Sequence, residues 1–405
     1  MFVDRSYRSS WMLLLVVVAG TAMAQICTPE YGNEGYSYII NNQSDLDEIA
    51  AKCTTVNGSI AMSYNFTGAF RLPNIRNITR TIKWLRILRL TEDSPKPTSI
   101  DLPDLEFLGG SLYMNGLPTL KSVTAPKLKT VGWNADIDYA EEVDFRSLTE
   151  SEYFSVMGNV SRCVNETSDN WHKCMVDGEV DECSLRLDSL RQVRQRVLIC
   201  NKEKCSREAS PHGSLDVSLP ALHDVGHLHL EGRFSSLDTP KLSNITGIGT
   251  GYYGIKLLTV GGPPINVSFP ELKYIDEETG LFLEGNIGGL SIPSISNFNV
   301  RLFVIAYDQL EIKLPFEEAE AIMLMGNISS VQLPNLKSLD QLLVNTDASL
   351  DCKSLKETIM TAINVSDYQV TCTVKNSASH FGLNLGAKVV FGSVVGVIVG
   401  LAMWY

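Results

Sequence analysis

The sequence predicts a mainly β fold in which short strands stack in successive coils, because two phrases recur along the chain. The first phrase is an apolar residue, Pro, any residue and a second apolar residue. Its prolines are 19 to 30 residues apart within each half of the chain. The copies begin at Leu72, Leu102, Ala125, Leu219, Thr239, Phe269, Ile292 and Leu333, with a partial copy at Leu314. The second phrase has the form Leu-x-Leu-x-Gly and begins at Leu112, Leu228, Leu281 and Ile322.

The period of each phrase explains this prediction. Alternation of apolar residues with period two is typical of a strand with one buried face, and the following Gly permits a turn. Pro is poorly tolerated in the middle of a ladder, so it closes the next short strand. A unit of 20 to 30 residues cannot bury its apolar face alone, whereas stacked units share a continuous core. The chain is therefore expected to form a leucine-rich-repeat-like or β-helical solenoid.

Helices are expected as short caps. Residues 44–52 open with Ser44 as an N-cap and lead into Cys53. Residues 355–363 have the same character beside Cys352. A third helical spacing, formed by Leu190, Val193 and Val197, precedes Cys200.

The repeats stop near Phe145 and resume near Leu215, which predicts two solenoid lobes. The first lobe is expected over 25–160 and the second over 214–375. Between them, 161–213 is expected to be a Cys-rich, partly helical connector or cap. One continuous solenoid with an insertion is the alternative.

Residues 1–24 are typical of a signal peptide. Arg5 and Arg8 precede a short apolar run, and Ala22-Met-Ala24 forms a small-residue cleavage site. The run is short for a bilayer span, so an uncleaved anchor helix is the alternative.

Residues 376–405 are typical of a glycosylphosphatidylinositol (GPI) attachment signal. Small residues, a polar spacer and an apolar tail from Val389 to Tyr405 follow one another, which predicts attachment at Asn376 or Ser377. A single transmembrane helix is the alternative, although such a helix normally keeps basic residues on its cytoplasmic side.

Ten sequons predict a glycosylated extracellular surface, and each places its Asn on the outside of the fold. They lie at Asn42, Asn57, Asn65, Asn77, Asn159, Asn165, Asn244, Asn266, Asn327 and Asn364.

Nine cysteines in a secreted chain indicate disulfides. The outer ones form the local pairs Cys27–Cys53 and Cys352–Cys372. The middle five allow two bridges and leave one thiol, and their pairing stays open. Their spacings lack the Cys-x-x-Cys pairs of a zinc site, which is the alternative. They are Cys163, Cys174, Cys183, Cys200 and Cys205.

Charge and motifs narrow the function classes. The 405-residue chain has a formal net charge of −12 and no long basic run, so no nucleic-acid partner is expected. The sequence contains none of the common nucleotide-binding or hydrolase motifs, so no cofactor is expected. The acidic pairs Asp45/Asp47 and Asp136/Asp138 are interpreted as surface charge, and no catalytic residue is predicted.

Three histidines form the strongest candidate metal site. His227 and His229 lie two residues apart, on one face of a strand, with His223 nearby. Because Leu228 and Leu230 take the buried positions, both histidines face outward. Three solvated histidines are the preferred interpretation, and no metal site is predicted.

An apolar stripe is expected on the outer face of the strands, where polar residues would be usual. It could be a partner-binding or glycan-stacking surface, or another part of the protein could cover it. It consists of Tyr113, His229, Phe282, Phe303 and Met323.

The order of these features resembles the receptor L-domain pattern and the fungal GPI-anchored cell-wall organisation proteins, which include sporulation-specific wall proteins. Cys27, Asp45-Leu46, Cys53 and Gly58-Ser-Ile60 precede the repeats in the same order. The resemblance implies a non-catalytic protein supporting wall organisation, at the plasma membrane through its lipid or in the wall, with wall polysaccharide or glycoproteins as partners. The Ser/Thr-rich stalk of that family is missing, since Cys372 almost adjoins Asn376. A receptor-like ectodomain and a wall-polysaccharide enzyme are the alternatives.

Overall fold

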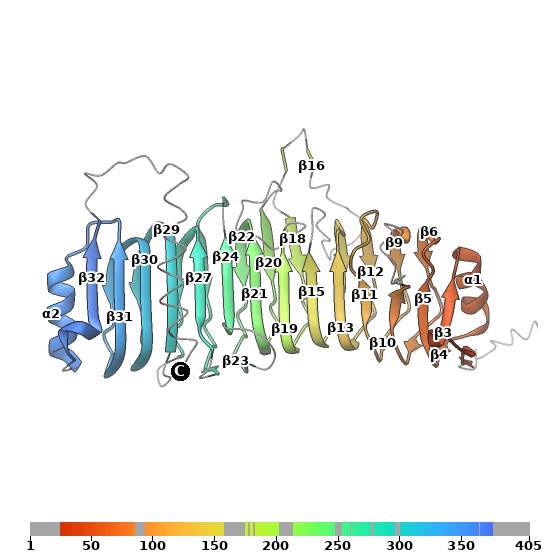
Figure 1. Ribbon diagram of the computed structural model, residues 1–405, viewed down its shortest axis with the longest axis horizontal. Coiled ribbons are helices and arrows are strands. Elements are labelled where there is room, and N and C mark those ends of the chain that lie inside the picture. The colour runs from red at the N-terminus through yellow and green to blue at the C-terminus, as the bar shows by residue number, and fades with distance from the viewer. Residues whose placement is uncertain are drawn as a thin grey trace, which may run out of the picture.

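The computed structural model describes residues 25–85, 94–157, 175–176, 179–180, 183–201, 214–247, 253–259, 261–276, 279–295, 300–363 and 365–375. The fold is mainly β, as the sequence predicts. Figure 1 shows the strands side by side in chain order along the long axis of the molecule, from helix α1 (Gln43–Lys52) at one end to helix α2 (Cys352–Ile363) at the other. The predicted signal peptide and GPI signal lie outside the described residues.

Most strands belong to one long sheet. Its strands are β1 (Ile26–Cys27), β2 (Tyr31–Gly32), β3 (Gly35–Ile40), β4 (Thr55–Val56), β5 (Ser59–Met62), β7 (Asn77–Ile78), β8 (Ile82–Trp84), β10 (Phe107–Leu108), β11 (Leu112–Met114), β13 (Thr130–Asp138), β15 (Glu150–Met157), β19 (Gln192–Cys200), β21 (Asp224–Gly232), β23 (Asn244–Ile245), β24 (Ile255–Thr259), β26 (Tyr274–Ile275), β27 (Leu281–Gly285), β29 (Val300–Lys313), β30 (Glu318–Gln332), β31 (Ser338–Thr346) and β32 (Val370–Val374).

Shorter ladders form a second set. They are β6 (Thr67–Arg71), β9 (Lys96–Asp101), β12 (Ser122–Thr124) and β14 (Glu142–Asp144); β18 (Cys183–Arg186), β20 (Leu215–Ser218) and β22 (Phe234–Asp238); and β25 (Ile265–Ser268) and β28 (Ile287–Ser291). Outside both sets, β16 (Met175–Val176) and β17 (Glu179–Val180) form a separate hairpin. A short 3₁₀ helix, η1 (Asp367–Gln369), precedes β32.

We call the stretch of chain from one strand of the long sheet to the next a coil. Successive coils pair through parallel strands, with equivalent residues opposite one another. Equivalent residues of neighbouring coils are 20 to 27 positions apart in the C-terminal half, as the rungs Leu228, Ile255, Leu281, Leu302, Ile322 and Leu342 show. The side chains on the inner face of the long sheet join one hydrophobic cluster with those of the second set. Each coil therefore buries its apolar face only together with its neighbours.

The Gly of the Leu-x-Leu-x-Gly phrase allows neighbouring coils to approach closely. Gly116, Gly232, Gly285 and Gly326 all have positive φ, which L-residues with a side chain rarely adopt. At Gly285 a Cβ atom would also lie 1.6 Å from the carbonyl oxygen of Thr259 in the preceding coil.

The Pro-containing phrase forms a turn directly after a strand, which in most copies is a strand of the second set. In the copy at Leu102, the backbone N–H of Leu105 donates to the carbonyl of Leu102 over 3.3 Å. Pro103 therefore occupies the second position of a turn, where its fixed φ is suitable. The same bond recurs at Leu128, Leu222, Leu242, Leu272 and Leu336.

The helical prediction before Cys200 is wrong. Leu190 ends a turn, with its N–H bonded to the Leu187 carbonyl, and Val193 and Val197 lie in strand β19. A spacing of four residues also places two side chains on one face of a strand, so it did not distinguish the two structures.

The coils also continue inside the predicted connector. Strand β19 pairs with β15 on one side and with β21 on the other, so one parallel ladder links the regions of the two predicted lobes. The division of the chain into two domains stays a prediction.

Helix α1 confirms the predicted N-terminal cap, but its N-cap is Asn42, not Ser44. The Asn42 side chain accepts a hydrogen bond from the backbone N–H of Ser44 over 2.9 Å. The disulfide Cys27–Cys53 closes this end of the structure, as predicted.

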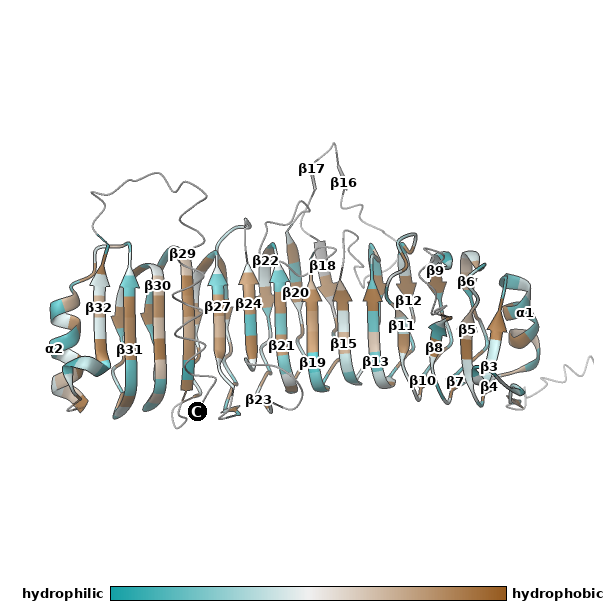
Figure 2. Ribbon diagram, in the orientation of Figure 1, coloured by the Kyte–Doolittle hydropathy of each residue, from teal (hydrophilic) through white to brown (hydrophobic). Residues whose placement is uncertain are grey.

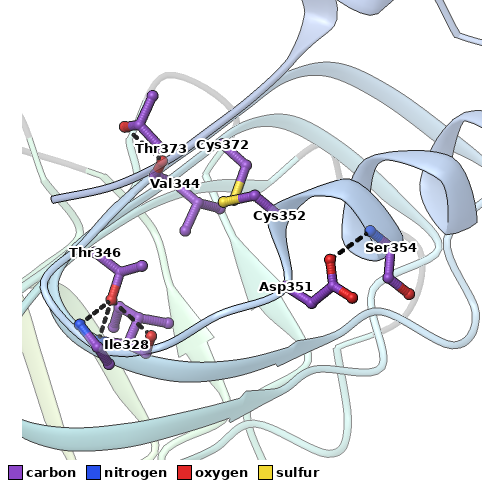
Figure 3. The surroundings of a disulfide bond; sticks show 9 residues. Ile328, Val344, Thr346, Asp351, Cys352, Ser354, Cys372 and Thr373 are labelled. Carbon is purple, nitrogen blue, oxygen red and sulfur yellow. Dashed lines mark hydrogen bonds between the residues drawn. A yellow bond between two sulfur atoms is a disulfide. The ribbon is translucent and has the colours of Figure 1, made fainter. Parts of the chain in front are cut away.

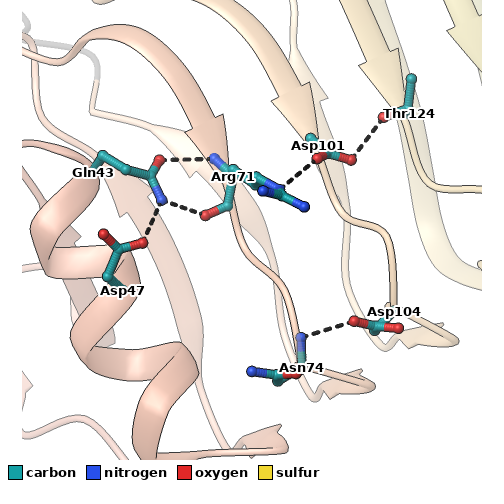
Figure 4. A network of polar contacts seen from close by, with 7 residues as sticks. All are labelled: Gln43, Asp47, Arg71, Asn74, Asp101, Asp104 and Thr124. Carbon is teal, nitrogen blue, oxygen red and sulfur yellow. Dashed lines mark hydrogen bonds and ion pairs between the residues drawn. The ribbon is translucent and has the colours of Figure 1, made fainter.

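A polar network joins α1 to the second set of strands (Figure 4). The Gln43 amide donates to the Arg71 carbonyl over 2.7 Å and accepts the Arg71 N–H over 2.9 Å. The side chain thus makes the two hydrogen bonds that a neighbouring strand would make to Arg71. The network continues from Arg71 to Asp101, over 3.0 Å, and from Asp101 to Thr124. Close by, Asp104 accepts the N–H of Asn74, whose φ is 66°.

Helix α2 confirms the predicted C-terminal cap and begins at Cys352, three residues earlier than expected. Its first turn is closed by Asp351, which accepts the N–H of Ser354 over 3.0 Å (Figure 3). The predicted disulfide Cys352–Cys372 fastens α2 to β32. Beneath it, the buried hydroxyl of Thr346 donates to the Ile328 carbonyl over 2.7 Å.

Replacing both Cys352 and Cys372 with Ala is expected to destabilise the C-terminal cap by about 3 kcal/mol, because the bond closes a loop of 20 residues. Hydrogen exchange should show faster exchange in α2 and β32 and unchanged exchange in α1. Equal protection of α2 and β32 in both proteins would contradict this expectation.

Gln43→Ala is expected to lower the local free energy of unfolding of α1 by about 1 kcal/mol, because the two bonds to Arg71 are lost. Hydrogen exchange of the α1 amides measures this change. Gln341→Ala, at an exposed position of β31, is the matched control and should leave α1 unchanged. Unaltered α1 exchange in Gln43→Ala would show that the helix docks by apolar contacts alone.

Candidate binding face of the long sheet

The five residues of the predicted stripe share one row across the outer face of the long sheet. Phe282, Phe303 and Met323 are direct register neighbours. The row is interrupted elsewhere, because Lys256 stands between His229 and Phe282. Asp136, Ser155 and Leu198 separate Tyr113 from His229. All five stripe residues are half-buried, and their role in binding stays a prediction.

An additional aromatic side chain packs on the C-terminal part of this row. The ring of Tyr253 lies 5.0 Å from that of Phe282 and 6.0 Å from that of Phe303. Figure 2 shows hydrophobic residues along most of the neighbouring strand β29. Aromatic pairs of this kind contribute about 0.5–1.5 kcal/mol each. The aromatic part of the stripe is thus partly occupied by the protein's own packing.

The three histidines differ in exposure, and the prediction that all are solvated is wrong. Leu228 and Leu230 point inward as expected, and His223 is exposed. His227, however, is only 2% exposed, and its Nδ1 lies 2.9 Å from the backbone carbonyl of Tyr253. Sequence alternation indicates which face a side chain takes but not what covers that face.

His229 belongs to a charged cluster with Glu231 and Lys256. His229 Nε2 lies 3.2 Å from the Glu231 carboxylate, and Lys256 Nζ lies 3.6 Å from the same carboxylate. Burial lowers the pKa of His229, the bond to Glu231 opposes this shift, and the positive charges of Lys256 and Arg196 add to it. No group of three or more His, Cys, Asp or Glu side chains within the described ranges is arranged to hold a metal ion.

The candidate acidic pairs take part in local hydrogen bonds. Asp45 accepts the N–H of Asn41 over 2.7 Å, and Asp47 accepts the Gln43 amide over 2.9 Å. Asp136 accepts from Asn115 over 2.8 Å, and Asp138 accepts the N–H of Gly116 over 3.1 Å. These bonds give each carboxylate a structural role at a cap or a turn.

None of the seven described sequon asparagines is buried. Asn42, Asn57, Asn65 and Asn266 are exposed, and Asn77, Asn244 and Asn327 are half-buried; Asn159, Asn165 and Asn364 lie outside the described residues. Of the middle cysteines, Cys200 is buried and disulfide-bonded, whereas Cys163, Cys174 and Cys205 lie outside the described residues and Cys183 is described only as part of β18. In the part of the chain that the structure describes, no helix has the length and apolar character to cross a bilayer.

A second surface, which the sequence analysis missed, lies where the strands bulge. The register shifts between Val131 and Asn134, and the extra residue Trp133 is 65% exposed. A bulge at the same level occurs in β19, where Arg194 and Gln195 lie opposite the single residue Glu152 of β15. The period-two pattern breaks at Gly132-Trp133, and that break was the available signal. We define the central patch as Trp133, Asn134, Glu152, Tyr153, Gln195 and Arg196.

Polar side chains of the central patch hold one another in place. Gln195 donates to Glu152 over 2.9 Å, and Asn134 donates to the Tyr113 hydroxyl over 3.3 Å. Arg196 donates to the Tyr153 hydroxyl over 3.0 Å and lies 5.1 Å from the centre of that ring. A cation over an aromatic ring is attracted to it, so the side chains are positioned before any ligand arrives.

Comparison with known proteins gives one informative similarity. The chain is 23% identical over 265 residues to protein ecm33 of Aspergillus fumigatus. The match covers 60% of this chain and 62% of that protein, so the chain spans less than two thirds of the relative's length. No known protein-family model matches the chain, and no solved structure matches it.

His229→Gln is expected to reduce the loss of stability at acidic pH. The pKa of His229 is lowered on folding from its ordinary value of 6.5, so the unfolded chain binds more protons between the two pKa values. Folding stability therefore falls as the pH falls through about 6.5 toward the folded-state pKa. Thermal melting across this range should show a shallower decline in the variant.

An exposed residue that does not titrate supplies the control for this measurement. Gln341→Ala should leave the pH dependence of melting unchanged. If His229→Gln and the unmodified protein lose stability in parallel, the titration of His229 does not contribute.

Proposed function

We propose that this protein is a GPI-anchored, N-glycosylated surface protein that supports fungal cell-wall organisation as a non-catalytic scaffold or adhesion protein. The similarity to Aspergillus ecm33 over 265 residues carries the proposal, since it agrees with the fungal wall-protein family indicated by the order of the cysteines and repeats. The partners would be wall polysaccharide or wall glycoproteins, and the location would be the outer leaflet of the plasma membrane or the wall.

The fold is consistent with a scaffold. We infer that the parallel coils form a leucine-rich-repeat-like or β-helical solenoid of the receptor L-domain type. The parallel strands from β3 to β32 present one long outer face. A disulfide-linked cap closes each end of the solenoid. A long, fixed face suits the simultaneous binding of extended or repeated partners better than the enclosure of a small substrate.

The proposed anchor would adjoin the last coil. Strand β32 ends at Val374, two residues before Asn376 in the sequence. A lipid attached there would hold the α2 end of the coil against the membrane with almost no spacer. This geometry favours retention at the membrane over transfer into the wall.

The proposal is tested by deleting the gene in its host and measuring growth with Calcofluor white, a dye that binds the wall. We expect hypersensitivity that the full chain rescues and that a chain ending before Asn376 does not. The two rescue chains differ only in the anchor signal, and immunoblotting confirms that both are made.

Other outcomes have a definite meaning. Dye resistance equal to that of the parent strain would reject the wall role and favour a receptor-like ectodomain with a soluble ligand. Rescue by the truncated chain would reject the need for an anchor while leaving the wall role in place.

A further inference from the structure

We propose that the central patch binds a neutral, linear glycan, with Trp133 as its stacking platform. This inference rests on the proposed function, which it deepens by naming the partner and the surface that holds it.

The position of Trp133 leaves one side of its ring open. The backbone N–H of Trp133 donates to the carbonyl of Gly110 in the preceding coil over 3.1 Å. That coil carries Gly109 and Gly110 at this level, which have no side chains, and the ring of Phe107 lies 3.2 Å from the position that a Cβ of Gly109 would take. A Cβ atom at Gly132 would lie 2.3 Å from the Gly109 carbonyl, so the close packing of these two coils requires glycine at position 132. The indole of Trp133, which is 65% exposed, therefore stands next to glycine backbone.

The neighbours of Trp133 on the other side are planar polar groups. Glu152 stands opposite the bulge in the next coil, followed by Gln195. Together with Asn134 and Arg196, they supply both hydrogen-bond donors and acceptors around an apolar ring. A sugar ring has the complementary character, because it offers a C–H face for stacking and a rim of hydroxyls that both donate and accept.

The balance of charge favours a neutral ligand. The charged members of the central patch are Glu152 and Arg196, which have opposite charges, and Glu152 also lies 3.9 Å from Arg194. The six residues of the patch therefore carry no net charge, and the whole chain is at −12. An anionic ligand would need a positive surface. A protein partner would need an apolar centre larger than one indole, because the cores of protein interfaces are mostly apolar.

The direction of the patch favours a linear chain. Trp133, Glu152 and Gln195 belong to successive strands, which lie about 4.8 Å apart. The row runs across the strands and hence along the long axis of the molecule (Figure 1). An extended polysaccharide could contact several coils in this direction, which would favour polymers over single sugars.

The test is titration of the purified full chain with three probes: laminarin (a soluble β-1,3-glucan), chitin oligosaccharides and mannan. Calorimetry and tryptophan fluorescence should show saturable binding of at least one probe. Trp133→Ala should weaken this binding at least about tenfold, because the stacking surface is lost. Trp133→Phe should retain most of the affinity, and Gln195→Ala should weaken binding several-fold.

The matched control is Tyr368→Ala, which removes an 82% exposed aromatic ring near the C-terminal cap. It should bind the probe like the unmodified chain. Melting temperatures of all variants establish that they are folded. Should Trp133→Ala misfold, Trp133→Phe and Gln195→Ala still test the patch.

The proposal is overturned if the unmodified chain saturates with none of the three probes, or if Trp133→Ala binds as tightly as the unmodified chain. It is also overturned if the patch variants lose a wall-protein partner but keep their glycan affinity. Growth with Calcofluor white separates the two proposals. If Trp133→Ala fully rescues growth of the deletion strain, the wall role is supported and the patch is not needed for it. If the chain binds glycan but the deletion strain grows normally, the patch is supported and the wall role is rejected.

Discussion

The in-register parallel ladder between coils is the interaction on which the rest of the structure depends. A single coil has too little apolar surface to be stable alone, and its core side chains are buried only when the next coil aligns residue for residue. Strict register fixes the distance between neighbouring coils, so a side chain cannot be accommodated where their backbones approach closely. Glycine is therefore required at positions 285 and 132. Strict register also places equivalent outward-facing residues of successive coils at a fixed spacing, so their side chains form rows along the sheet.

The sequence predicted the parts of the fold that follow from short-range periodicity. Leu228 and Leu230 are buried because period two fixes their face, and Pro103 lies in a turn because it cannot join a ladder. The spacing of Val193 and Val197 fits both helix and strand, so the register with neighbouring coils decided the outcome. The correction from Ser44 to Asn42 as the N-cap is a shift of two residues at a helix boundary, the least predictable part of an element.

The outer face was harder to predict, because its character depends on contacts between distant coils. His227 is buried and contacts the backbone carbonyl of Tyr253, a residue 26 positions away. Trp133 is exposed because a bulge shifts it out of the alternating pattern. The stripe aligned correctly as a row, but Lys256 and Asp136 divide it. The face therefore has two distinct surfaces, an aromatic one partly filled by Tyr253 and a polar one with a projecting indole.

The two caps determine how copies of this molecule can meet. An uncovered terminal strand of a parallel ladder would offer unpaired backbone groups to another chain and could extend without limit into a fibre. Here α1 and α2 lie beyond the terminal strands and are each tied down by a disulfide. Within the described residues, the two caps therefore hinder strand pairing between copies at the ends of the long sheet. The faces of the sheet are left as the larger surfaces through which two copies could meet.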